Sequence, residues 1–307
     1  MRNKQNNFRP DKPERLKYHV DYPQDTDFSA YARLLQSKWR QGKGYPELKM
    51  GSFLDVEYAK KEKSNFLTPK IQKLVEDKIA ESKKTGGLIS EPRIWNNLLS
   101  SQPLCFNLFG ELVSDDWELA TEFFHRLFPE IVDRVNRIEF EYSPGRGDKK
   151  YTEDHSAFDV FVEYTKEEKK GFIGIEVKYA ESLKEESRKK AEEYYKPIYK
   201  QKTESSGLFV ENSVEQLRYP PLSQIWRDHL LSIALRKDYD EGFFVFLYPS
   251  KNLNCQDGVD NFRKLLKSQD ERINGFCPRY LDDFIEILHN IVNQDWTTEL
   301  KERYLGR

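Results

Sequence analysis

The sequence has few cysteines, the residues that form disulfide bonds, and no long run of apolar residues. Its three cysteines, Cys105, Cys255 and Cys277, are widely spaced, odd in number and include no Cys-x-x-Cys pair. This pattern argues against a disulfide framework and a structural zinc site. The apolar runs fall far short of a membrane span, and the N-terminal residues lack the apolar stretch of a secretory signal. We therefore expect a cytoplasmic protein with no membrane partner.

An excess of one charge is also missing. The 50 Lys and Arg residues balance 52 Asp and Glu, which gives a formal net charge of −2. This balance argues against a uniformly basic nucleic-acid coat, but a basic groove on a neutral body remains open. The sequence contains no P-loop, no dinucleotide-binding glycine fingerprint and no His-Glu-x-x-His zinc motif, so an ATP-driven motor is not expected. Aromatic residues are abundant at 14%, which indicates a packed core rather than a disordered chain.

The length of 307 residues suits one large domain with additions, or two small domains. Residues 1–27 are polar and contain three prolines, so we expect an arm that is loosely ordered unless something docks it. Apolar residues at helical spacing predict helices over 28–40 and 68–84. We interpret 1–92 as an N-terminal arm and helical accessory region, and 93–307 as the main domain with C-terminal helices.

The main domain alternates between helical and strand patterns. Helices are predicted over 93–109, 117–127, 181–196, 222–237, 259–268 and 278–292, and strands over 138–142, 157–164, 171–179 and 242–248. Such an order predicts an α/β domain with a central mixed β-sheet flanked by helices.

One pair of strands carries acidic and basic residues in a pattern that suggests chemistry. Side chains alternate along a strand, so Glu176 and Lys178 share a face, and Gly174 on that face would leave room beside them. If the two central strands pair as a hairpin, Asp159 comes close to Glu176. Two carboxylates and a lysine suit Mg²⁺, which prefers oxygen ligands and can activate water for attack on a phosphoryl group.

A structural explanation of the same residues is available. Glu-x-Lys is common in strands, where it usually forms a solvent-facing ion pair. However, Asp159 and Glu176 lie within strongly apolar strands, where an unpaired carboxylate is costly. This context favours a functional site over a surface ion pair.

The surrounding residues resemble those of a known family. The runs Ser156-Ala-Phe-Asp159 and Phe172-Ile-Gly-Ile-Glu176-Val-Lys178-Tyr179 resemble the PD-(D/E)XK nuclease superfamily, and more narrowly a group of bacterial restriction-endonuclease-like nucleases. The similar stretch covers about residues 93–250 and includes Phe106-Asn-Leu-Phe-Gly110 and Gln224-Ile-Trp-Arg-Asp-His-Leu230. The resemblance implies a restriction-endonuclease-like core with a helical N-terminal extension.

The resemblance also implies roles for individual residues. Asp159 and Glu176 would bind the metal ion, and Val177 would offer its backbone carbonyl. Lys178 would be the catalytic lysine, and Gln224 would face the site from the helix that follows. The superfamily often adds an acidic residue on the helix before the sheet.

Three residues compete for that additional acidic position. Glu118 and Glu111 precede the sheet, and either fits the place that the resemblance gives. Glu141 lies in the strand before Asp159 and could reach the same centre. The sequence leaves this choice open.

Several other residues have both a functional and a structural interpretation. Arg227 and His229 lie on the same predicted helix as Gln224, and they could contact the scissile phosphate or simply be polar residues of that helix. Arg146, in a Ser-Pro-Gly-Arg-Gly turn, could contact backbone phosphate or belong to an ordinary surface turn. The stretch 184–202 interleaves basic residues with tyrosines, which is typical of nucleic-acid binding, but its four glutamates favour a solvated helix.

Together these observations predict Mg²⁺-dependent hydrolysis of phosphodiester bonds by an endonuclease, with Mn²⁺ as a substitute. DNA is the expected substrate and RNA the second choice. One alternative is a catalytically silent nuclease fold that binds nucleic acid or a protein partner, and another is a metal-dependent hydrolase of nucleotides. A homodimer or a partner from a defence system is compatible with the sequence, and neither is required by it.

Overall fold

The computed structural model describes residues 8–87, 89–183 and 187–307. The described chain packs as two compact units, and neither unit is one continuous segment. Unit 1 takes the described residues within 1–110, 179–181 and 288–307, and unit 2 takes those within 111–178 and 182–287. Among these residues, no helix combines the length and the apolar character needed to cross a membrane.

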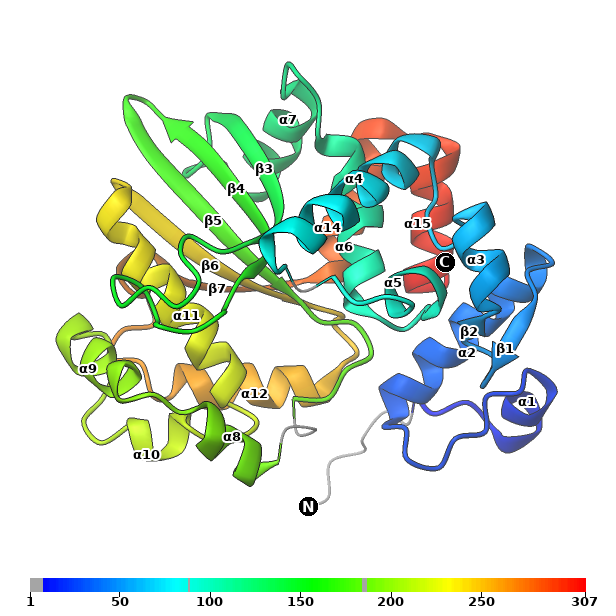
Figure 1. Cartoon of the computed structure of the whole chain (residues 1–307), viewed down its shortest axis with the longest axis horizontal. Coiled ribbons are helices and arrows are strands. Elements are labelled where there is room, and N and C mark those ends of the chain that lie inside the picture. Colours follow the sequence, from blue (N-terminus) through cyan, green and yellow to red (C-terminus); the bar gives the residue numbers. More distant parts are fainter. Residues whose placement is uncertain (1–7, 88, 184–186) are drawn as a thin grey trace. The chain divides into compact units, whose positions relative to one another are not determined.

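The centre of unit 2 is a five-stranded sheet, in the order β3-β4-β5-β6-β7 (Figure 1). The strands are β3 (Arg134–Tyr142), β4 (Phe158–Lys166), β5 (Lys169–Val177), β6 (Glu241–Tyr248) and β7 (Phe276–Tyr280). The first three strands run antiparallel, whereas β5, β6 and β7 run parallel. The predicted α/β class with a mixed central sheet is therefore confirmed.

The hairpin of β4 and β5 holds the residues of greatest interest. Val160 pairs with Ile175, and Phe161 pairs with Gly174. The two strands are joined after the pair Lys166–Lys169 by a two-residue turn, in which Glu167 has a φ of 54°. Turns with left-handed residues match the twist of paired strands, so the chain can reverse here without splaying the hairpin.

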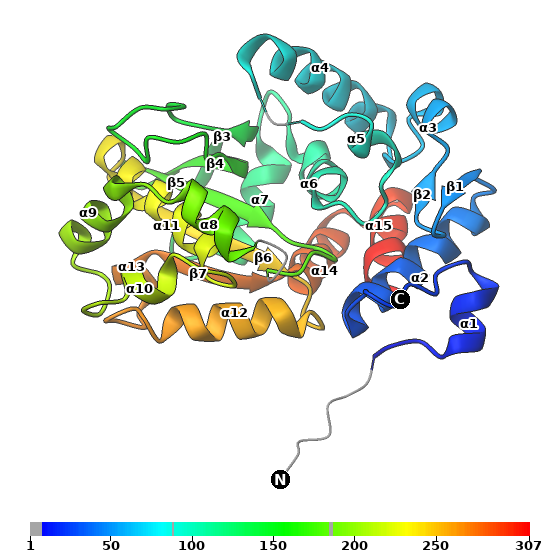
Figure 2. The ribbon, with the colours of Figure 1, turned by 60° about the horizontal axis from the view of Figure 1, so that its bottom comes forward.

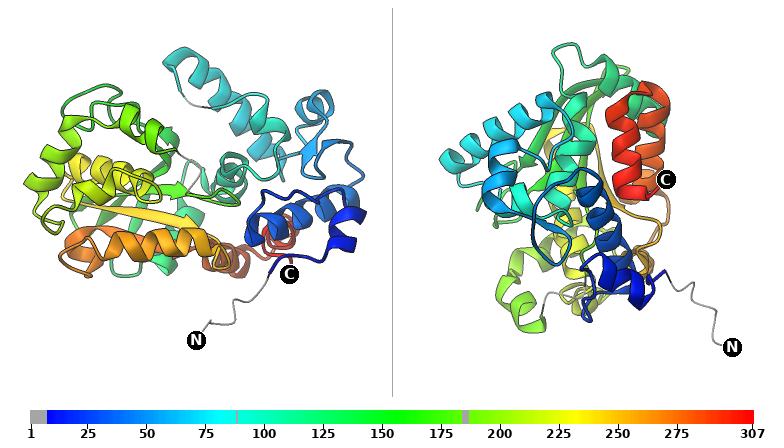
Figure 3. Two further views of the ribbon diagram at one scale, coloured as in Figure 1. Left: turned by 90° about the horizontal axis from the view of Figure 1, so that it is seen from below. Right: turned by 90° about the vertical axis from the view of Figure 1, so that its right-hand side faces the viewer.

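Helices of unit 2 cover the sheet and bury its aromatic side chains. They are α7 (Glu118–Leu127), α8 (Arg188–Tyr194), α9 (Pro197–Ser206), α10 (Val214–Leu217), α11 (Ser223–Leu235), α12 (Leu253–Arg263) and α13 (Glu271–Asn274). Trp226 of α11 and Phe262 of α12 share one hydrophobic core with Phe161, Phe172 and Phe244 of the sheet. Figure 3 shows α12, in orange, alongside the yellow α11. α14 (Leu281–Val292) begins in unit 2 and ends in unit 1.

Unit 1 is mostly helical, as expected for the N-terminal extension. Its elements are α1 (Lys12–Lys17), α2 (Asp27–Gly42), the short strands β1 (Glu47–Lys49) and β2 (Phe53–Leu54), α3 (Val56–Glu62), α4 (Pro69–Thr85), α5 (Arg93–Asn96), α6 (Ser101–Phe109) and α15 (Asp295–Leu305). The 3-10 turn η1 (Gly110–Leu112) follows α6, and η2 (Arg236–Asp238) follows α11.

A buried arginine joins the first and last parts of unit 1. Arg303 of α15 is completely buried and donates hydrogen bonds to Oε1 of Gln36 at 2.9 Å and to the carbonyl oxygen of Asn65 at 2.9 Å. Its guanidinium also lies 4.0 Å from the ring centroid of Trp39. Nε2 of Gln36 donates in turn to the hydroxyl of Tyr179 at 3.1 Å. The residue that follows Lys178 in the chain is thus part of the core of unit 1.

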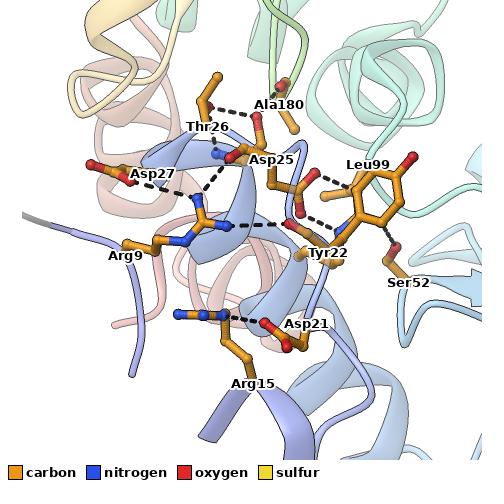
Figure 4. A network of polar contacts seen from close by, with 12 residues as sticks. Arg9, Arg15, Asp21, Tyr22, Asp25, Thr26, Asp27, Ser52, Leu99 and Ala180 are labelled. Carbon is orange, nitrogen blue, oxygen red and sulfur yellow. Dashed lines mark hydrogen bonds and ion pairs between the residues drawn. The ribbon is translucent and has the colours of Figure 1, made fainter. Parts of the chain in front are cut away.

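The N-terminal arm is docked from residue 8 onward. Arg9 donates to the carbonyl oxygens of Asp25 at 2.7 Å and Tyr22 at 3.2 Å (Figure 4). Arg15 pairs with Asp21 at 3.0 Å. The Asp25 carboxylate accepts both a 2.6 Å and a 2.7 Å hydrogen bond from Arg33 of α2. The arm is therefore docked, which is the condition under which we did not expect loose order, and the pair of Asp25 with Arg33 attaches it to α2.

Other elements differ from expectation for reasons of local backbone chemistry. The single helix predicted over 93–109 is divided into α5 and α6. The helical stretch before Pro197 is shorter than predicted, because the residue that precedes a proline is disfavoured in the helical region, and Lys196 is extended with a ψ of 141°. Strand β7 contains Pro278 and escaped prediction, but it lies at the edge of the sheet, where proline is tolerated. Residues 184–186 of the predicted 181–196 helix lie outside the described part of the chain.

Candidate active site on strands β4 and β5

The hairpin brings Asp159 to the end of β5, where Glu176 and Lys178 lie. Oδ2 of Asp159 accepts a hydrogen bond from the backbone N–H of Val177 at 2.8 Å. The next residue, Lys178, donates its backbone N–H to the carbonyl oxygen of Leu247 at 2.8 Å, so β5 stays attached to β6 beyond its last assigned residue. The backbone on both sides of Val177 is therefore held by neighbouring strands.

The side chains of Glu176, Lys178 and Gln224 form one cluster, in which Glu176 and Lys178 are buried and Gln224 is half-buried. Nζ of Lys178 lies 2.6 Å from Oε1 of Glu176, and Nε2 of Gln224 lies 2.6 Å from the same oxygen. Glu176 is 6% exposed and Lys178 is 8% exposed. Charge-assisted hydrogen bonds in such a dry environment are stronger than those in water. Gln224 reaches the cluster from α11, on the aromatic side of the sheet.

Negative charge accumulates around Asp159. Its pKa is raised well above the usual value, first by burial and then by the charges of Glu176 and Glu141. Lys178 and the N–H of Val177 act in the opposite direction. Burial and the two neighbouring carboxylates therefore both disfavour the ionised form of Asp159, and a cation bound beside it would favour that form.

Asp228 is a fourth acidic residue near this cluster, and sequence reasoning missed it. It lies on α11 four residues after Gln224, a spacing that places both on one face of the helix. Asp228 is 6% exposed, and its Oδ2 has no hydrogen-bond partner among the described residues. Burial raises its pKa well above the usual value, and the charge of Glu176 is the next cause. The signal available in the sequence was this acidic residue between the apolar Trp226 and Leu230.

The three residues expected to compete for the additional acidic position lie in different places. Glu141, near the end of β3, acts electrostatically on Asp159. Glu118 begins α7 and lines a cavity together with His125 and Asp133. Glu111 lies in η1. Of the three, Glu141 is among the charges that raise the pKa of Asp159.

The two arginines expected to contact nucleic acid lie in different settings. Arg227 is half-buried on α11, with its guanidinium 5.8 Å from the ring centroid of Tyr194. Arg146 is half-buried in the connection between β3 and β4, and its Nη1 is buried without a hydrogen-bond partner among the described residues. That connection is fixed through Asp154, whose carbonyl oxygen accepts from the N–H of Gly147 at 2.6 Å and whose carboxylate accepts from the hydroxyl of Tyr199 at 2.5 Å.

Two expectations about space and contact are wrong. Gly174 was expected to leave room beside Glu176, but the ring of Phe158 fills that space, 2.5 Å from where a Cβ would stand. His229 was considered for contact with phosphate, but it is completely buried, with Nε2 2.8 Å from the carbonyl oxygen of Asn274. Its ring stacks on Phe244 at a centroid distance of 6.1 Å. Both residues serve the packing of α11 on the sheet.

The donor set suits a hard divalent cation that keeps water ligands. In the described part of the chain, no three His, Cys, Asp or Glu side chains are grouped so as to enclose a metal ion. Mg²⁺ does not require such a cage, since it binds through one or two carboxylates and retains several waters. Asp159 and Glu176 supply two carboxylates, and the unpartnered Oδ2 of Asp228 is a further oxygen without a donor. These residues fit Mg²⁺.

Comparison with known proteins agrees with this chemistry. The family model of the PD-(D/E)XK nuclease superfamily matches residues 23–306. Searches of curated proteins and of solved structures find no match. The match covers unit 2, including the five-stranded sheet with Asp159 and Glu176-Val-Lys178, and unit 1 from residue 23 onward except Arg307. The chain belongs to the PD-(D/E)XK nuclease superfamily.

Proposed function

We propose that the protein is an endonuclease that hydrolyses phosphodiester bonds in DNA with the help of Mg²⁺. Members of its superfamily are generally nucleases that use divalent metal ions. The observation that carries the proposal is the cluster in which Lys178 and Gln224 share one oxygen of Glu176, while Asp159 accepts from the N–H of the next residue, Val177. Mn²⁺ is the expected substitute for Mg²⁺, because it accepts the same oxygen ligands.

Asp159 and Glu176 would hold the metal ion, together with the backbone carbonyl of Val177. A bound divalent ion stabilises charge on the phosphoryl oxygens and lowers the pKa of its water. Asp228 and Glu141 add negative charge around the same place and would strengthen the attraction for the cation. The contribution of this chain is a set of oxygens that are held in place by backbone and amide donors before the ion arrives.

Lys178 would hold or transfer a proton at Nζ, next to the attacking water, and would stabilise charge that develops on the phosphate. Its position depends on the 2.6 Å contact with Glu176. Gln224 would fix the orientation of the same carboxylate from the opposite side. Arg146 and Arg227 would contact phosphates of the substrate strand away from the scissile bond.

A catalytically silent module that binds DNA, RNA or a protein is the competing function. The full set of Asp159, Glu176, Lys178 and Gln224 supports the enzyme, since a module that only binds has no need for a buried lysine–carboxylate pair. Burial of such a pair is costly unless its hydrogen bonds compensate, and replacing it with apolar residues is often neutral or stabilising.

Cleavage of plasmid and single-stranded DNA with Mg²⁺, Mn²⁺ or EDTA tests the proposal. Wild type should cut with either metal and not in EDTA, and Lys178→Ala should lose the activity. Lys189→Ala, which removes an exposed lysine of α8, is the matched control and should cut normally. Cutting that survives Lys178→Ala would refute the site assignment, and metal-supplemented wild type that cuts neither DNA would favour the silent module.

A further inference from the structure

Five side chains of unit 2 stack in series between α8 and α11. The guanidinium of Arg188 lies 4.8 Å from the ring centroid of Tyr219, and that of Arg218 lies 5.1 Å from the same centroid. Arg218 also lies 4.7 Å from the ring centroid of Tyr195. The Tyr195 ring in turn stacks on Trp226, with 6.5 Å between centroids and 22° between planes. We call this series the arginine–tyrosine ladder.

The two arginines of the ladder have no anionic partner in the part of the chain that the structure describes. Among the described residues, neither Arg188 nor Arg218 forms a hydrogen bond or an ion pair through its side chain, and Nε of Arg218 is buried without any partner. Neighbouring groups behave differently. Lys189 of the same helix pairs with Glu193 at 4.0 Å, and Glu192 accepts a hydrogen bond from the hydroxyl of Tyr219 at 3.0 Å. The ladder therefore keeps two positive charges uncompensated in a chain whose acids outnumber its bases.

Stacking prepares these guanidiniums for phosphate. An arginine that lies over an aromatic ring is held by cation–π attraction, while its in-plane N–H donors remain available at the edge. Guanidinium donors match the geometry of phosphate oxygens, and a side chain that is already held loses less conformational entropy on binding. Of the glutamates that favoured an ordinary solvated helix, the two in the described part of the chain bind other groups: Glu192 accepts from Tyr219 and Glu193 pairs with Lys189.

The inner end of the ladder reaches the helix that carries the candidate site. Trp226 is almost completely buried on α11, two residues after Gln224, whose amide holds Glu176. Figure 2 shows α8 in front of α11, and the stacking of Tyr195 on Trp226 fixes that contact. The outer end is Arg188, the first residue of α8. A strand that follows the ladder inward would be led to the helix that supports Glu176.

We propose that the arginine–tyrosine ladder binds the phosphodiester backbone of the DNA strand that enters the candidate active site. This inference rests on the proposed nuclease function and specifies how its substrate is held. Two phosphates would occupy the donor edges of Arg188 and Arg218. The tyrosines would serve mainly to hold the arginines in position.

The test measures DNA binding separately from cleavage. Fluorescence anisotropy of labelled single-stranded and duplex DNA, in EDTA and again in Ca²⁺, gives the affinity at several salt concentrations. Arg188→Gln with Arg218→Gln should weaken binding and lower the slope of log K against log salt by about 2, one for each lost phosphate contact. Lys189→Gln and Arg126→Gln remove exposed positive charges off the ladder and should change the slope much less.

A second pair of variants examines the ring without altering charge. Tyr219→Phe keeps the ring between the two arginines and should bind DNA as wild type does. Tyr219→Leu removes the ring and should reduce affinity several-fold, while circular dichroism and the melting temperature report whether the fold is retained. Equal binding by Tyr219→Leu and Tyr219→Phe would refute the role of the stack.

The outcomes separate the ladder from the nuclease. The proposal that the ladder binds DNA would be overturned if the double arginine variant kept the salt slope of wild type, or if the two charge controls lowered the slope by as much. Cleavage by wild type would still support the nuclease function in that case. A reduced slope in the double variant supports the ladder even where cleavage is absent. Wild type that binds no DNA, but captures an acidic peptide through Arg188 and Arg218, would overturn the assignment to DNA.

Discussion

Gln224 of α11 donates to Oε1 of Glu176 at 2.6 Å, and this is the same oxygen that Lys178 holds at 2.6 Å. The glutamine is 48 residues away in sequence from the carboxylate that it orients. A carboxylate with one oxygen tied in this way presents its other oxygen in a fixed direction. The proposed metal site therefore depends on a helix as well as on two strands.

Gln224→Leu should slow cleavage on the order of ten- to a hundredfold, because a carboxylate that has lost one donor can turn away from the productive geometry. The reduction should be mainly in kcat, since no substrate phosphate is bound by the amide in our proposal. Single-turnover kinetics with saturating DNA checks this. Gln216→Leu, an exposed glutamine of α10, is the control. A loss confined to KM would show that Gln224 binds substrate instead.

Asp228→Asn should stabilise the metal-free protein by about 1–3 kcal/mol, because it replaces a buried carboxyl, whose charged form is disfavoured by burial and by Glu176, with a neutral amide. Mg²⁺ should raise the melting temperature of wild type, and it should do so less for the variant. Thermal melting in EDTA and across a Mg²⁺ series measures both effects. Asp257→Asn, on the exposed side of α12, should change neither. Destabilisation by Asp228→Asn would mean that the carboxylate already has a favourable partner.

His229 should make the fold sensitive to acid. Burial lowers its pKa to about 3, and the charge of Arg236 acts in the same direction, although the carbonyl oxygen of Asn274 opposes it. In the unfolded state the histidine has a pKa near 6.5, so as the pH falls its imidazole is protonated before that of the folded state. The contribution of His229 to the free energy of unfolding is therefore fully present above pH 6.5. It falls by up to about 1.4 kcal/mol per pH unit toward pH 3.

Urea unfolding between pH 7 and pH 4 tests the histidine. Because glutamine cannot take up a proton, the free energy of unfolding of His229→Gln should fall less between pH 7 and pH 4 than that of wild type. This holds even if the variant is less stable than wild type at pH 7. His155→Gln removes an exposed histidine instead and should leave the decline in place. A decline as steep in His229→Gln as in wild type would assign acid sensitivity to other groups.

Arg303→Met should destabilise the protein by at least about 3 kcal/mol. It leaves Oε1 of Gln36 and two oxygens of Asn65 buried without their donor, and each such group costs about 1–3 kcal/mol. Lys301→Met, on the same helix, removes a charge without opening this network and should cost much less. Denaturant unfolding measures both, and a cost below 1 kcal/mol for Arg303→Met would show that water replaces the guanidinium.

Local patterns predicted the centre of the fold well. Alternation in β4 and β5 is a property of adjacent residues, so the hairpin and its Asp159, Glu176 and Lys178 could be found from the sequence, and Gln224 followed from the resemblance. Asp228 was missed: its place between Trp226 and Leu230 was a signal, but its importance depends on which face of α11 meets the sheet. Strand β7 was missed because it contains Pro278. Proline is tolerated in an edge strand, but the local sequence does not show that β7 lies at the edge of the sheet.

The interleaving of the two units affects the order in which the protein can fold during synthesis. The Asp159 hairpin and Lys178 leave the ribosome well before α15, yet Arg303 of α15 is needed to complete the core that holds Gln36 and, through it, Tyr179. Unit 1 therefore cannot close until about 300 residues have been made. A growing chain would carry all of its proposed catalytic residues for some time before the segment next to Lys178 is secured, which would delay activity until α15 has been made.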